Sequence, residues 1–154
     1  MATVYSVQKT KWNQNVPSEK IKPNETGGRV RIGYALYEAS SLASGDVIEM
    51  FNLPSGARIL EGTLTHDAMG SSTTLAVVHG AYKNADGTDV ALDADEFFAA
   101  AASTSITTVA VAATSALGRN TVIDADGDGY PVTVTMGGAA GTGTVELQML
   151  YVVD

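Results

Sequence analysis

The stretch TVELQMLYVV, residues 144–153, has the clearest strand pattern in the sequence. Its side chains alternate between two faces: Val145, Leu147, Met149, Tyr151 and Val153 on one, and Glu146, Gln148, Leu150 and Val152 on the other. Period-two alternation is typical of a β-strand, and the second half of this stretch is apolar on both faces. We therefore expect 144–153 to form a strand in the centre of a sheet or at an interface.

Similar patterns recur at short intervals along the chain. Strand-like segments are 29–37, 46–53, 58–66, 73–82, 105–114 and the flanks TVI and PVTVTM of residues 124–131, with turn residues between them. In the first of these, Val30, Ile32, Tyr34 and Leu36 share one face. Charged residues make up 17% of the chain, whereas about 25% is usual. The sequence therefore predicts an all-β, single-domain β-sandwich or jelly roll of about eight strands.

Two segments depart from the strand pattern. DADEFFAAAAS, residues 93–103, offers Asp93 as an N-cap, acidic residues in a first turn and an alanine run. These features predict one short helix that contacts the body through Phe97 and Phe98. GGAAGTG, residues 137–143, predicts a flexible loop.

Chain length and composition exclude several classes of protein. A chain of 154 residues without cysteine is long enough for one hydrophobic core and forms no disulfide. It has no apolar run of about 18 residues, so we expect no membrane-spanning helix. The start MATVYSVQKTKW does not resemble a signal peptide, and we expect synthesis in a host cytoplasm without export by the Sec route.

Residues 1–28 predict an extended basic arm, and residues 29–154 predict the β-sandwich or jelly-roll body. Within the arm, only residues 3–8 have a pattern that a strand would accept. Residues 1–31 carry six Lys or Arg against two Glu, a net charge of +4, and residues 32–154 carry three against 15 carboxylates, a net charge of −12. A basic arm on an acidic body is typical of an interaction protein, although a solvated basic tail would have the same charge. Nucleic acid is a poor partner because the body would repel phosphates.

Trp12, the single tryptophan, lies among polar residues of this arm. An aromatic side chain of that size needs a core or a neighbouring subunit to contact. The residues that we expect to contribute to an interface are Lys9, Lys11, Trp12, Lys20 and Lys22.

The turn DADGDGYP, residues 124–131, resembles the first half of a calcium loop. Asp124, Asp126 and Asp128 occupy ligand positions 1, 3 and 5, but position 12 is Thr135 and the flanks predict strands, not helices. It fails as an EF-hand. Two interpretations remain: a weak calcium site at these three aspartates, and a solvated acidic hairpin turn, which we favour.

The sequence contains no convincing set of catalytic or metal-binding residues. His66 and His79 could share a metal if their strands were adjacent, but no third ligand is evident. There is no G-x-S-x-G motif, and the glycine-rich runs lack the lysine of a phosphate-binding loop. We expect no catalytic residue, no cofactor and no enzymatic activity.

Residues 40–82 contain, in order, a GDVI strand, an LPSGARI turn and strand, and GSSTTL leading into another strand. This order resembles small structural proteins of tailed bacteriophages, among them capsid decoration (cement) proteins. The resemblance implies a trimeric β-sandwich or jelly roll on the outer surface of the phage head. It further implies that the major capsid protein is the partner and that the head is stabilised by bridging its capsomers.

Two other functions remain open from the sequence. Strand patterns alone do not separate a decoration protein from a tail, neck or head-fibre component of the virion. A secreted, calcium-dependent binding module is a third possibility because of DADGDG and NADGTD, although the chain start does not support export.

Overall fold

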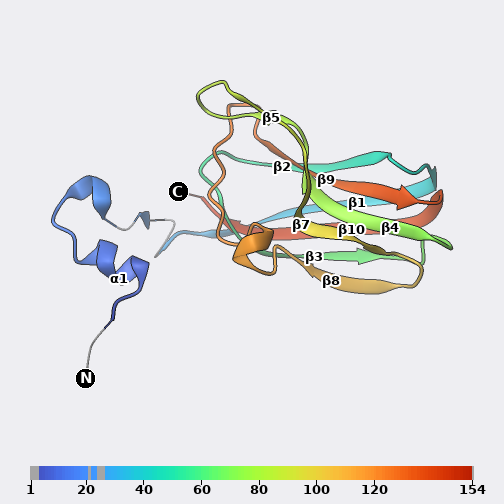
Figure 1. The fold of residues 1–154 in the computed structure, drawn as a ribbon, viewed down its shortest axis with the longest axis horizontal. Coiled ribbons are helices and arrows are strands. Elements are labelled where there is room, and N and C mark those ends of the chain that lie inside the picture. Colours follow the sequence, from blue (N-terminus) through green and yellow to red (C-terminus); the bar gives the residue numbers. More distant parts are fainter. Residues whose placement is uncertain (1–3, 21, 24–26, 154) are drawn as a thin grey trace.

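Two four-stranded antiparallel sheets packed face to face make up the body of the protein (Figure 1). The computed structural model describes residues 4–20, 22–23 and 27–153. The first sheet has the order β1-β10-β3-β8 and the second has the order β2-β9-β4-β7. A small β5-β6 hairpin projects beyond the second sheet. The described residues thus confirm the all-β sandwich that the alternating pattern predicts.

The elements of the described residues have the following bounds. The strands are β1 (Val30–Leu42), β2 (Val47–Leu53), β3 (Arg58–His66), β4 (Thr73–His79), β5 (Tyr82–Lys83), β6 (Asp89–Val90), β7 (Asp93–Ala102), β8 (Thr107–Val111), β9 (Tyr130–Gly138) and β10 (Gly141–Val152). The helical elements are α1 (Val7–Trp12) and the 3₁₀ turns η1 (Pro17–Glu19) and η2 (Ser115–Leu117).

The connections between the two sheets define a jelly roll. Apart from the β4–β7 connection, each link between consecutive long strands crosses from one sheet to the other. When the short hairpin is left out and the long strands are numbered along the chain, the sheets have the orders 1-8-3-6 and 2-7-4-5. This arrangement of interleaved Greek keys is the jelly-roll topology.

The hydrophobic core lies between the sheets. Its largest fully buried side chains come from both: Leu53, Ile59, Leu64, Leu75, Phe97, Met136, Leu147 and Met149. β10 lies between β1 and β3, which confirms the central position expected of residues 144–153. Each fully buried Leu, Ile or Met stabilises the fold by about 1.5–3 kcal/mol, so this interface supplies most of the driving force for folding.

The helix predicted near 93–103 is wrong, because these residues form strand β7. The strand pairs with β4 through Leu75↔Ala101 and Val77↔Phe98. Phe97 is fully buried against the core. Alanine has the highest helix propensity, but propensity is a weak effect, and sheet pairing together with burial of one phenylalanine outweighs it.

The flexible loop predicted at 137–143 is also wrong. Gly138 is the last residue of β9 and Gly141 the first of β10, so Ala139 and Ala140 alone join the two strands. Gly138 has a φ of 76°. A Cβ at this position would lie 2.0 Å from the carbonyl oxygen of Ser72. The glycine is therefore required both by backbone conformation and by the close approach of the neighbouring chain.

The N-terminal segment contains helical elements that the sequence analysis missed. Residues that were expected to be extended form α1 and η1, and the strand considered at 3–8 is absent from its described residues 4–8. Ser6 caps α1, since its hydroxyl oxygen accepts a hydrogen bond from the Lys9 backbone N–H at 3.2 Å. The segment lies outside the two sheets, beyond the end where β10 finishes (Figure 1), and its Gln8, Lys11 and Lys22 line a cleft together with Arg58 and Asn120 of the body. Neither it nor the rest of the described chain includes a helix with the length and hydropathy needed to span a membrane.

Replacing Gly138 with alanine should destabilise the fold far more than replacing Gly87. Both glycines have positive φ, but an added Cβ at Gly87 meets nothing within 4 Å. Gly87→Ala should therefore cost about 1 kcal/mol of backbone strain. Gly138→Ala should cost about 1–3 kcal/mol more because of the clash. Urea unfolding of both variants measures the difference, and equal losses would contradict the close packing at the β9–β10 turn.

Candidate functional site

The N-terminal segment exposes its apolar side chains. No residue of α1 is buried, and Trp12 is 60% exposed. The other exposed apolar side chains of the segment are Val4, Tyr5, Val7 and Val16. A helix of six residues is marginal in water without tertiary contacts. Contact of this segment with another surface would therefore stabilise both the helix and the exposed tryptophan.

The lysines predicted at the interface lie along the same segment. Lys9 and Lys11 belong to the last turn of α1. Lys9, Lys20 and Lys22 are exposed, and Lys11 is half-buried. All four lysines lie within ten residues of Trp12 in the sequence, so this segment is both basic and apolar.

A second exposed apolar surface lies on β1, the edge strand of the first sheet. Val30, Ile32, Tyr34 and Leu36 are each 54–57% exposed. The sequence correctly places them on one face, and the structure shows that this face points away from the core. On the opposite face of β1, Gly33 leaves room for a core aromatic side chain, because a Cβ at this position would lie 2.7 Å from the ring of Phe51.

Residues of the neighbouring strands extend this apolar stripe into a larger surface. Opposite residues of antiparallel strands share a face, and the register gives the rows Ile32–Leu150–Glu61, Tyr34–Gln148–Thr63 and Leu36–Glu146–Thr65. The side chains interact across the strands: the Gln148 amide donates to the Thr63 hydroxyl at 2.8 Å, and Thr65 and Thr108 share a hydrogen bond of 3.0 Å. We call this surface, formed by β1, β10, β3 and β8, the outer face of the first sheet.

The outer face carries negative charge beside its apolar stripe. Glu38, Glu61 and Glu146 project from β1, β3 and β10, and none of them is buried. Glu38 accepts a hydrogen bond from the Thr144 hydroxyl at 2.9 Å. The face is thus apolar and acidic, whereas the N-terminal segment is apolar and basic.

The acidic turn at 124–131 does not gather its carboxylates. Asp126 accepts the backbone N–H of Asp128 at 3.0 Å, and its own N–H donates to the Lys83 carbonyl at 2.8 Å. Asp124 and Asp128 are exposed. Across the described residues, the one group of three candidate metal ligands lies elsewhere. The turn is held by these contacts and by the Asn52 amide, which donates to the Asp128 carbonyl at 3.0 Å.

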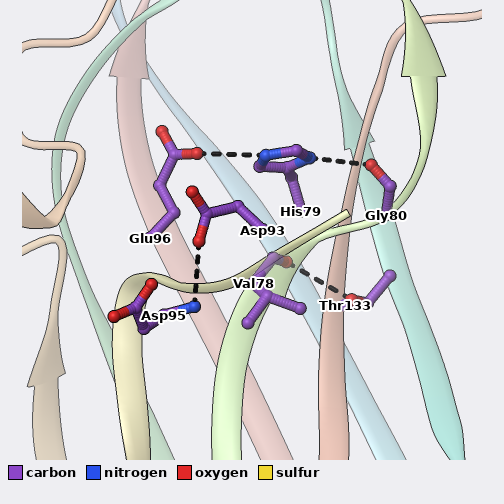
Figure 2. A network of polar contacts seen from close by, with 7 residues as sticks. All are labelled: Val78, His79, Gly80, Asp93, Asp95, Glu96 and Thr133. Carbon is purple, nitrogen blue, oxygen red and sulfur yellow. Dashed lines mark hydrogen bonds and ion pairs between the residues drawn. The ribbon is translucent and has the colours of Figure 1, made fainter. Parts of the chain in front are cut away.

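That group consists of His79, Asp93 and Glu96, at the end of β4 and the start of β7 (Figure 2). His79 is 4% exposed, and its Nε2 lies 3.2 Å from a Glu96 carboxylate oxygen. On the other side of the ring, Nδ1 lies 2.8 Å from the Gly80 carbonyl oxygen. Asp93 is the β-sheet partner of His79 and accepts the backbone N–H of Asp95 at 3.1 Å.

The surroundings of His79 favour its charged form. Burial, the largest single effect, opposes protonation, but the hydrogen bonds to Glu96 and Gly80 and the charges of Glu96 and Asp93 together raise the pKa of His79. The rings of Tyr82 and Tyr130 pack against the imidazole at centroid distances of 5.3 and 5.2 Å. Burial, followed by the charge of Glu96, raises the pKa of Tyr130, which keeps this phenol neutral.

Sequence analysis missed this group. His66 and His79 do not share a site: they lie on β3 and β4, which belong to different sheets. The sequence pattern predicted a helix for the segment that contains Asp93 and Glu96, and a helix would not have paired with the strand that carries His79. The DADE segment was the available signal, and only its pairing with β4 brings it to His79.

Comparison with known proteins points to phage capsids. No protein-family model matches the sequence, and a search of curated proteins finds no relative. A chain in a structure described as the capsid of Ralstonia phage GP4 is 27% identical over 82% of this chain and 86% of its own, with a TM-score of 0.60. A chain of the Cyanophage Pam1 capsid asymmetric unit is 21% identical over 84% and 88%, with a TM-score of 0.58.

The two similarities differ in what they support. The Pam1 likeness supports the fold alone. The GP4 likeness, together with the jelly roll, supports a structural protein of a bacteriophage virion. A structural role of this kind favours a non-enzymatic protein.

In metal-free buffer, the His79–Glu96 pair should make stability depend on pH. Because the folded-state pKa is raised, protonation of His79 stabilises the fold fully below the unfolded pKa of about 6.5. This contribution should be lost as pH rises through the folded-state pKa. Urea unfolding from pH 5 to 9 measures it, and Glu96→Gln should reduce the pH dependence. An identical pH profile in that variant would contradict the pairing; the other charged group facing the ring is Asp93.

Proposed function

We propose that the protein is a capsid decoration protein that binds the outer surface of a bacteriophage head and stabilises it by bridging capsomers. The similarity to a chain of the GP4 capsid supports a virion protein. The observation that carries the further step is an N-terminal segment whose apolar side chains, Trp12 foremost, have no core of their own. Such a segment is suited to holding the body on a larger assembly.

In this proposal, the N-terminal segment is the part of the protein that binds the surface of the head. Burying the exposed part of Trp12 alone would contribute about 2–4 kcal/mol. Its lysines would add charge attraction to acidic surfaces, which accelerates encounter and fixes orientation. Ordering on contact is typical of a short segment whose apolar side chains are exposed.

The outer face of the first sheet is suited to contact between copies of the chain. We propose a homotrimer in which this face contacts the neighbouring copy. The apolar stripe of β1 would be buried there. Cyclic symmetry would give each copy the same contact and close the assembly.

The major capsid protein is the proposed partner. A decoration protein that binds only the assembled head stabilises it by mass action, since binding is linked to the assembled state. The strong negative charge of the body suits a surface that faces solvent, and it disfavours contact with nucleic acid.

Removing residues 1–28 should abolish head binding and leave the body folded. Among the residues that the structure describes, the core cluster begins at Ala39, so the truncated protein should keep its cooperative unfolding transition. Co-sedimentation with heads that lack the protein measures binding. Retained binding by the truncated, folded protein would overturn the role of this segment.

Trp12→Ala tests the contribution of this one side chain to head binding. It should weaken head binding at least about 10-fold without changing the melting temperature, because the lost contact is worth more than 1.4 kcal/mol. Leu92→Ala is the matched control, since Leu92 is 46% exposed and lies in the body outside the outer face. Equal effects of the two substitutions would argue against a specific anchor.

Polar substitution of the β1 stripe should separate the copies. Ile32→Ser combined with Leu36→Ser removes two exposed apolar side chains, so the monomer should stay folded while the trimer dissociates. Sedimentation velocity measures the assembly state of the wild type and the variant. A wild-type ring of six or twelve copies would instead favour a neck or tail component, and an unchanged trimer in the variant would exclude this face from the contact.

A further inference from the structure

We propose that His79, Asp93 and Glu96 form a binding site for one divalent first-row transition-metal cation, of which Zn²⁺ is the natural probe. Each residue offers a ligand atom, and these atoms lie within 4.8 Å of one another. The site joins the end of β4 to the beginning of β7, next to the Gly80 turn (Figure 2). It is independent of the N-terminal segment and of the outer face of the first sheet.

The histidine is already oriented as a metal ligand. The Gly80 carbonyl only accepts hydrogen bonds, so the Nδ1 atom 2.8 Å away carries the proton and donates it. The other ring nitrogen, Nε2, then points at the carboxylates. A ring N–H that donates to a backbone carbonyl, which fixes the ring and raises the basicity of the opposite nitrogen, is the usual support of a metal-bound histidine.

The contact between His79 and Glu96 requires a positive charge. The lone pair of a neutral Nε2 and a carboxylate oxygen are both acceptors, and the imidazole is buried, so water offers little relief. Either a proton or a metal ion between them removes the conflict. The observed separation of 3.2 Å exceeds the 2.7–2.9 Å typical of charge-assisted hydrogen bonds. Two ligands of a tetrahedral Zn²⁺ are about 3.4 Å apart, given metal–ligand distances of about 2.0–2.2 Å.

The surroundings leave room to complete the coordination. Asp93 is exposed and Glu96 is half-buried, so both carboxylates can rotate toward the imidazole nitrogen. Asp93 and Glu96 also line a cleft bounded by Ser115 and Thr121, from which water can supply a fourth ligand. One imidazole with two carboxylates suits Zn²⁺ and its first-row neighbours, whereas Ca²⁺ prefers six to eight oxygen ligands.

A bound cation would fasten the edge strand β7 to the sheet. The β4–β7 pairing is irregular, with register shifts on both sides of Val77↔Phe98. His79 and Asp93 form the last pair of that ladder. A metal bridge at this end would hold the two strands together where the regular pairing is interrupted, and it would stabilise the folded state by mass action.

Calorimetric titration of the full-length protein, without an affinity tag, with Zn²⁺ tests the proposal. We expect one Zn²⁺ per chain, a rise in melting temperature that a chelator reverses, and no binding of Ca²⁺ at the same concentrations. Asp93→Asn and Glu96→Gln keep side-chain volume and should each weaken Zn²⁺ binding at least about 10-fold. Co²⁺ in place of Zn²⁺ should give visible absorption that is lost in the same variants.

Two control substitutions separate a built site from general affinity for metal. His66→Gln removes a histidine that is equally buried and whose Nδ1 also lies against the next residue's carbonyl, but which is not in the group. Asp128→Asn removes an exposed carboxylate of the 124–131 turn that is not in the group. Both should bind Zn²⁺ like the wild type.

His79→Gln should abolish binding; if this core substitution does not fold, the carboxylate variants still decide the question. Absence of Zn²⁺ binding, or equal affinity in wild type, Asp93→Asn and Glu96→Gln, would overturn the proposal and leave the proton as the cation of this pair. Neither result would bear on head binding, which depends on other residues.

Discussion

Pairing of the last strand of the body with its first strand is the constraint on which the structure depends. β10 lies between β1 and β3, so one strand connects the beginning of the body to its middle. Its inward side chains, among them Leu147 and Met149, are fully buried. Its outward side chains join those of β1 and β3 in the outer face. The same strand therefore stabilises the core and shapes the surface that we propose for assembly.

Much of the fold was predictable because strand patterns are local. Period-two alternation located nearly every long strand, and β3 occupies the predicted 58–66. The error at β7 arose because alanine content indicates a helix locally, whereas strand pairing is decided by a distant partner. The missed helix α1 is the opposite case: polar residues obscured a short element whose only clear signal is the Ser6 cap.

The candidate sites were less predictable than the fold. The sequence showed that Val30, Ile32, Tyr34 and Leu36 share one face of a strand. It did not show that this face points away from the core, an orientation in which Gly33, on the opposite face, makes room for the ring of Phe51. The group around His79 depends on the register that places Asp93 opposite it. No local pattern encodes that register. Asp124, Asp126 and Asp128, the weaker calcium interpretation of the 124–131 turn, do not form a group of three ligands in the described residues, and Asp126 uses its carboxylate to hold its own turn.

The separation of β1 from its partner in sequence has a consequence for synthesis. Leu42 pairs with Gly141, about 100 residues later in the chain, so the first sheet cannot form until β10 has been synthesised. While the ribosome is still making the intervening strands, β1 presents an unpaired edge together with its apolar stripe. A nascent chain in that condition is prone to pair with its neighbours on the same message, so efficient folding would depend on rapid completion of the chain or on chaperones.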